Sequence, residues 1–130
     1  MGKVEDKKRF SVIKRIKSSN HAFRGFLIVI RTTHNFILQI FIGILAIILG
    51  ISLKISITEW MILVFAIGIV LLTEIINTAI EIDIDLTSPE YHPYAKDTKD
   101  VSAAAVLFAV FIACIIGILI FLPKIINLYI

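Results

Sequence analysis

Four polar residues with helical spacing lie at the end of a long apolar stretch. They are Glu74, Asn77, Glu81 and Asp85, separated by three, four and four positions. At about 100° per residue they fall within about 80° of one helix face, whereas Asp83 lies about 180° from it. An ionisable side chain inside lipid costs about 2.5–3.5 kcal/mol on insertion scales. This face, and not Asp83, is therefore the candidate reactive surface.

The depth of the two glutamates in a membrane indicates the kind of chemistry. If Trp60 marks one interface, Glu74 lies about 21 Å and Glu81 about 31 Å further along the helix. In a hydrocarbon layer of about 30 Å, Glu81 reaches the opposite boundary and Glu74 stays roughly 10 Å inside it. A carboxylate in partly apolar surroundings suits a general base. The arrangement favours a reaction between a lipid head group and a water-soluble partner. A small acid-lined proton or ion transporter is an alternative.

Membrane-spanning helices must position this face. Of the 130 residues 58% are hydrophobic, and the mean hydropathy is +0.96. Three stretches contain no Asp, Glu, Lys or Arg: residues 32–53, 60–73 and 101–123. Since about 20 residues cross the hydrocarbon layer, we predict an all-α membrane protein in a single domain, 1–130. Its transmembrane helices are expected near 36–53, 60–82 and 101–122.

The N-terminal segment is basic and amphipathic. Residues 1–31 hold nine of the 13 Lys and Arg, interleaved with helically spaced apolar residues. This pattern is typical of a helix on an anionic membrane surface, predicted at about 9–31, and a solvated positive flank is the alternative. Because basic flanks stay inside, we expect a multi-pass protein of the inner (cytoplasmic) membrane. Its N-terminus would be cytoplasmic and its C-terminus outside. The basic segment leads straight into the membrane, so nucleic-acid binding is not expected.

The segment after the second span is short and charged. Its motif SPEYHP contains two prolines that end the helix and predict a loop. Asp97 or Ser102 is the predicted cap of the following helix. Lys99, beside acids at the boundary, can hold phosphate, and ordinary charge flanking a span is the alternative. The chain contains no GxxxxGK[ST] motif, which excludes a P-loop kinase.

Two motifs carry a resemblance to a known family. EIINTAIEIDID at 74–85, followed by SPEYHPYAKDTKDVSAAAVL at 88–107, resembles the small prokaryotic diacylglycerol kinase family, which includes undecaprenol kinases. The resemblance covers about residues 10–122, and SPEYHP is more similar to the undecaprenol kinases. It implies a homotrimer of three-helix subunits, each with a surface helix, that share active sites. Such an enzyme uses Mg²⁺ and ATP to phosphorylate a membrane lipid alcohol, diacylglycerol or undecaprenol, at the cytoplasmic face.

The resemblance also implies roles for individual residues. Glu74 would be the catalytic base that takes the lipid hydroxyl proton, and Glu81 would hold magnesium. Asn77 and Asp85 would support the site. The implied nucleotide-binding residues are Lys14, His21, Glu81, Glu90, Tyr91, His92, Lys99 and Asp100.

The chain departs from the family pattern at Thr33. In RTTHNFILQ, Thr33 takes the place of a glutamate that is the second metal-binding carboxylate in relatives, and Ile37 replaces a frequent basic residue. Thr33 could hold magnesium through water, or the metal could rely on Glu81 and the phosphates. A catalytically weakened or repurposed homologue is therefore an alternative to an active lipid kinase. The sequence does not distinguish diacylglycerol from undecaprenol.

Overall fold

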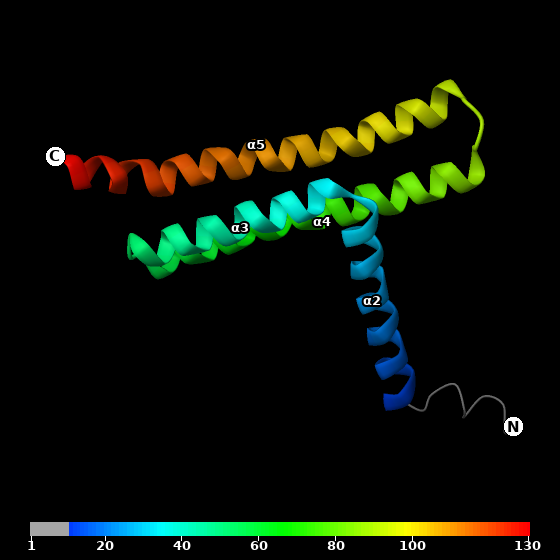
Figure 1. The fold of residues 1–130 in the computed structure, drawn as a ribbon, viewed down its shortest axis with the longest axis horizontal. Helices are drawn as coiled ribbons and strands as arrows, with labels where there is room; N and C mark the ends of the chain where they lie inside the picture. The colour runs from blue at the N-terminus through cyan, green and yellow to red at the C-terminus, as the bar shows by residue number, and fades with distance from the viewer. Residues whose placement is uncertain (1–10) are drawn as a thin grey trace, which may run out of the picture.

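Four helices make up almost all of residues 11–130, which are the residues that the computed structural model describes. They are α2 (Val12–Thr32), α3 (His34–Ser52), α4 (Ile57–Thr87) and α5 (Pro93–Tyr129). No strand occurs in this described part of the chain. Helices α3, α4 and α5 run alongside one another in alternating directions, whereas α2 projects away from them (Figure 1). The predicted all-α fold is confirmed. Positions 9 and 10 of the predicted surface helix lie outside the described residues.

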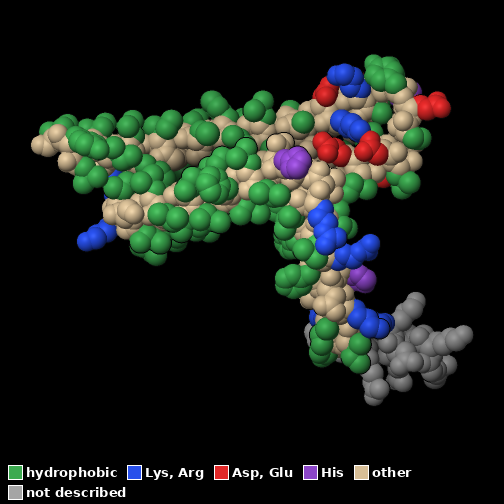
Figure 2. All heavy atoms as spheres, viewed as in Figure 1, with side chains coloured by type: hydrophobic (Ala, Val, Ile, Leu, Met, Phe, Trp, Pro, Cys, Tyr) green, Lys and Arg blue, Asp and Glu red, His purple; other side chains and the backbone are tan. Residues whose placement is uncertain are grey.

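Helices α3, α4 and α5 are each long and apolar enough to cross a membrane. Their large apolar side chains mostly face outward, as Phe65 and Leu107 do with 72% of each residue exposed. Figure 2 shows apolar side chains over most of the bundle face in view, up to the charged side chains near the α4–α5 turn. Such helices suit a lipid environment, because their backbone hydrogen bonds are satisfied internally and their apolar side chains can face the hydrocarbon. The chain is therefore a membrane protein with the three predicted spans, although α4 and α5 extend beyond spans 60–82 and 101–122 at both ends.

The end of the bundle near the α3–α4 turn is tightly packed. Ile55, Leu63, Ile120 and Phe121 form a buried apolar cluster there, with Trp60 packed against it. A Cβ atom added to Gly50 would lie 2.9 Å from the Trp60 ring, so glycine permits the close approach of α3 to α4. The α4 N-terminus is fixed by Ser56 and Glu59, whose side chains each accept a hydrogen bond from the other's backbone N–H.

The start of α5 differs from the prediction. The expected caps, Asp97 and Ser102, are wrong: the His92 side chain accepts the hydrogen bond from the Tyr94 backbone N–H, at 3.1 Å. Pro93 takes the first helical position, where its missing N–H is not needed. The loop after α4 is therefore short, and Lys99 and Ser102 lie well inside α5, facing α4.

Candidate active site

The polar face of α4 forms a gradient from buried to exposed. Glu74 is 2% exposed and Asn77 is 6% exposed. Glu81 is half-buried, and Asp85 and Asp83 are exposed. The helical spacing therefore places the residues as expected from the sequence. The gradient runs toward the α4–α5 turn, where acidic and basic side chains gather (Figure 2).

The buried Glu74 carboxylate has one hydrogen-bond partner among residues 11–130. Gln39 of α3 donates from Nε2 to Oε2 of Glu74 at 3.1 Å. The other end of the Gln39 amide, Oε1, is buried and has no partner within the described chain. Gln39 belongs to the segment RTTHNFILQ around Thr33, and nothing in the sequence predicted its contact with Glu74. The available signal was a polar side chain inside the charge-free stretch 32–53.

Asn77 joins α5 to the half-buried glutamate. The Ser102 hydroxyl of α5 donates to Asn77 Oδ1 and also lies 3.1 Å from the backbone oxygen of Lys99. The Asn77 Nδ2 group donates to Glu81 Oε1 at 3.3 Å. Ser102 is 7% exposed. It is therefore a buried contact of the polar face and not the helix cap that the sequence predicted.

Lys99 brings a positive charge to the exposed end of the same face. Its ammonium group forms an ion pair with Asp85, which links α5 to α4. Lys99 lies outside the charge-free stretch 101–123. Its hydrogen bond to Asp85 raises the pKa of Lys99 above its ordinary value. The group therefore stays cationic at neutral pH. Lys96 instead pairs with Asp100 at 2.7 Å, within α5.

The remaining predicted residues do not join this face within one chain. Glu90 and Tyr91 are exposed in the α4–α5 loop, and the His92 ring is used to cap α5. Lys14 and His21 are exposed on α2, which leads away from the bundle (Figure 1). In the part of the chain that the structure describes, no hydrogen bond or ion pair connects the side chains of Lys14 or His21 to α4.

Thr33 lies at the bend between α2 and α3. Its hydroxyl donates to the Val29 backbone oxygen at 3.2 Å, and its side chain is half-buried. Across residues 11–130 no three His, Cys, Asp or Glu side chains are grouped to hold a metal ion. Within the described residues of one chain, a divalent cation would therefore meet fewer than three such side chains at any one place. This fits Mg²⁺ that arrives with nucleotide phosphates, because Mg²⁺ usually takes one or two carboxylates and keeps waters.

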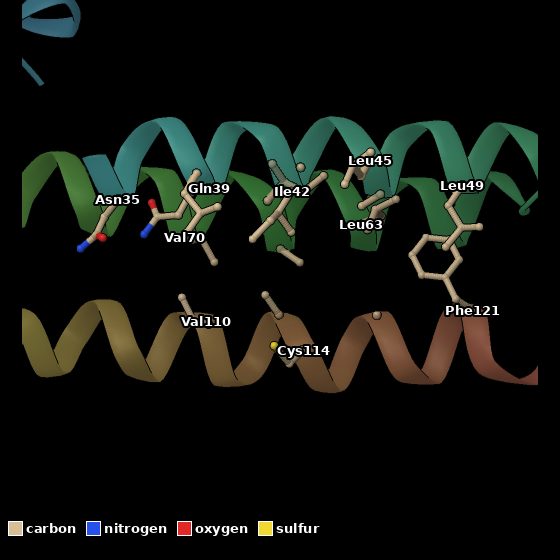
Figure 3. Close-up of a pocket in the computed structure, with 17 residues that line it drawn as sticks. Asn35, Gln39, Ile42, Leu45, Leu49, Leu63, Val70, Val110, Cys114 and Phe121 are labelled. Carbon is tan, nitrogen blue, oxygen red and sulfur yellow. The ribbon is translucent and has the colours of Figure 1, made fainter. Parts of the chain in front are cut away.

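An apolar groove of about 550 Å³ lies between α3, α4 and α5. Asn35 and Gln39 lie at one end of it, and Leu49 and Phe121 lie at the other (Figure 3). Val110 and Cys114 of α5 form the opposite wall. The groove therefore leads along the apolar part of the bundle to the side chain that contacts Glu74.

Comparisons with known proteins agree on one family. The model of the family described as prokaryotic diacylglycerol kinase matches residues 20–121. The chain is 44% identical over 108 residues to the undecaprenol kinase of Bacillus subtilis, covering 83% of this chain and 88% of that protein. It is 33% identical over 112 residues to a diacylglycerol kinase of Synechocystis, covering 85% of this chain and 64% of that protein. The diacylglycerol kinase of Escherichia coli K12 is 33% identical over 72 residues, 55% of this chain and 59% of that protein.

Proposed function

The chain belongs to the prokaryotic diacylglycerol kinase family, and on this premise we propose that it transfers phosphate from ATP to undecaprenol. As a member it is a lipid kinase that uses ATP. We propose undecaprenol rather than diacylglycerol as the substrate because this chain is 44% identical to the undecaprenol kinase of Bacillus subtilis. It is 33% identical to the diacylglycerol kinase of Synechocystis. The observation that carries the proposed mechanism is the face of α4, on which a buried carboxylate leads to a half-buried one and then to an ion-paired lysine.

In the proposed reaction Glu74 is the general base. One carboxylate oxygen takes the proton of the lipid hydroxyl while the lipid oxygen bonds to the γ-phosphorus of ATP. The bond from the γ-phosphorus to the bridging oxygen breaks, and its electron pair leaves with ADP. Glu74 lies about 10 Å along the helix from Glu81, which leaves room for the transferred phosphoryl group. Burial at Glu74 suits a lipid acceptor, and exposure at Glu81 suits a nucleotide arriving from water.

The charged end of the face would bind the nucleotide. Lys99 offers three donors to phosphate oxygens, and Glu81 would hold Mg²⁺, which neutralises phosphate charge when bound. Asn77 would fix the Glu81 carboxylate through the hydrogen bond that it donates. Asp85 would hold Lys99 in place until phosphate binds. Glu90, Tyr91, His92 and Asp100 remain proposed nucleotide contacts on the resemblance alone.

We also propose a homotrimer with active sites built from two chains. The supporting observation is that Lys14 and His21 lie on a helix that leads away from its own bundle (Figure 1). A neighbouring copy could bring them to the polar face of α4. The basic N-terminal segment would keep this end of the protein at the cytoplasmic face of the inner membrane. Mixed assembly of Lys14→Gln and Glu74→Gln chains tests the sharing. Recovered activity supports it, and activity no higher than in either variant alone contradicts it.

The direct test of the function uses purified protein in detergent with Mg²⁺ and ATP. Undecaprenol, 1,2-diacylglycerol and an undecaprenyl ester without a free hydroxyl are supplied separately, and products are identified by mass. We expect undecaprenyl phosphate as the main product, less phosphorylated diacylglycerol, and none from the ester. Preferred phosphorylation of diacylglycerol would overturn the assigned substrate. No lipid phosphate from folded protein would overturn the proposed activity.

A further inference from the structure

We propose that Gln39 is the positioning residue for the general base, and this inference rests on the proposed role of Glu74. The amide of Gln39 donates the one hydrogen bond that the Glu74 carboxylate accepts among the described residues. The two side chains come from different helices, 35 positions apart in the sequence. The bond therefore fixes Glu74 relative to α3, and a change on α3 can move the carboxylate without altering α4.

The polarity of the contact matches an ionised base. A carboxylate is an acceptor only, so it requires a donor, and Gln39 presents Nε2 to it. The bond engages Oε2 of Glu74 and leaves Oε1 free to meet the lipid hydroxyl. A neutral amide holds the carboxylate without cancelling its charge, whereas Lys or Arg at this position would form an ion pair with the base.

The unpartnered oxygen of Gln39 gives a second reason for a functional role. A buried polar atom without a hydrogen bond is unfavourable, and native structures contain few of them. Gln39 Oε1 is such an atom within residues 11–130. Once the lipid proton is on Oε1 of Glu74, Oε2 becomes the carbonyl oxygen of a neutral carboxyl group and still accepts from Gln39 Nε2. An amide can therefore pair with the base both before and after proton transfer.

The position of Gln39 connects the base to the groove. Gln39 lines the groove between α3, α4 and α5 (Figure 3). Asn35 is one turn earlier on α3 and lines the same groove, but among the described residues its side chain makes no hydrogen bond to Glu74. These two amides therefore form a natural comparison: one holds the base and the other does not.

The test compares Gln39→Met with Asn35→Leu, which each replace an amide by an apolar side chain of similar size. The turnover number and both Michaelis constants are measured with ATP and the lipid alcohol, together with thermal unfolding in detergent. We expect Gln39→Met to lower kcat about ten- to a hundredfold, the range for a hydrogen bond to a charged group. The Michaelis constants should stay within about twofold, because a base acts in the transition state. Asn35→Leu should keep kcat near that of the wild type.

A donor-retaining variant separates positioning from packing. Gln39→His carries an N–H at a similar reach and should recover much of the kcat lost in Gln39→Met. An unchanged kcat in Gln39→Met, or equal losses in the Met and His variants, would overturn the inference. Glu74→Gln is measured beside them. If Glu74→Gln is inactive but Gln39→Met is normal, only the role of Gln39 fails. If Glu74→Gln is fully active, the proposed base itself is wrong.

Discussion

Ser102 on α5 donates a hydrogen bond to the side-chain oxygen of Asn77 on α4, and this contact holds the Asn77 side chain against α5. With Oδ1 turned toward Ser102, Nδ2 points along α4 to the carboxylate of Glu81, 3.3 Å away. The reversed amide would place an oxygen against that carboxylate, which is unfavourable. A serine on one helix thus orients the proposed magnesium ligand on another.

Removing the Ser102 hydroxyl should disturb both the packing and the site. We expect Ser102→Ala to lower the free energy of unfolding by about 1 kcal/mol, a typical value for a hydrogen bond between membrane helices. It should also raise the magnesium concentration needed for half-maximal activity, because the Asn77 side chain then loses its contact with α5 and holds Glu81 less firmly. Ser52→Ala is the control, since the Ser52 hydroxyl bonds only within its own helix. Identical behaviour of the two variants in unfolding and magnesium titration would count against this role.

The two faces of α4 should differ in their importance for activity. Asp83→Asn changes an exposed carboxylate on the opposite face and should leave turnover within about twofold of the wild type. Glu81→Gln removes the carboxylate that accepts from Asn77. Turnover should fall by at least about tenfold, which is the typical cost of losing a hydrogen bond to a charged group. Initial rates at saturating ATP provide the comparison. Equal losses would show that helical phase does not define the site.

Lys99 and Lys124 offer a comparison for nucleotide binding, because each forms an ion pair with an acidic residue of α4. Lys99→Gln should raise the Michaelis constant for ATP about tenfold, because a charge-assisted contact to phosphate is lost. Lys124→Gln should have little effect, since Lys124 pairs with Glu59 at the opposite end of α4, 3.2 Å away. The raised pKa of Lys99 keeps its charge present through neutral pH, and it is lost only as pH rises past that pKa. Equal Michaelis constants in the two variants would remove Lys99 from the nucleotide site.

Thr33 provides a test of the magnesium site. If Thr33 faces the metal, the site is short of one negative charge, and hard cations prefer charged oxygen ligands. We expect Thr33→Glu to lower the magnesium concentration needed for half-maximal activity. In the alternative, in which the site has been rebuilt around Thr33, the added charge reduces activity. A magnesium titration of the wild type and Thr33→Glu at fixed ATP distinguishes these two alternatives. An unchanged magnesium concentration for half-maximal activity would mean that Thr33 does not face the metal.

Features that depend on one helix were predictable from the sequence, and features that depend on two helices were not. The shared face of Glu74 and Glu81 follows from helical spacing alone. The contacts of Gln39 with Glu74 and of Ser102 with Asn77 were not predictable, because each joins two helices and spacing says nothing about which helices meet. The cap of α5 was misplaced because Asp and Ser were preferred over His92, although Pro93 marked the helix start. The proposed role of Lys14, on α2, depends on a second copy of the chain and could not follow from one sequence.

The central claim is that Glu74 is the base for transfer to a lipid hydroxyl, and the turnover of Glu74→Gln tests it most directly. The substitution keeps side-chain volume while removing the ability to take a proton. We predict that purified Glu74→Gln keeps the oligomeric state and thermal unfolding of the wild type. Its rate of lipid phosphate formation should fall by at least about a hundredfold, the lower range for general base catalysis. A folded Glu74→Gln protein that phosphorylates the lipid at near wild-type turnover would contradict the account.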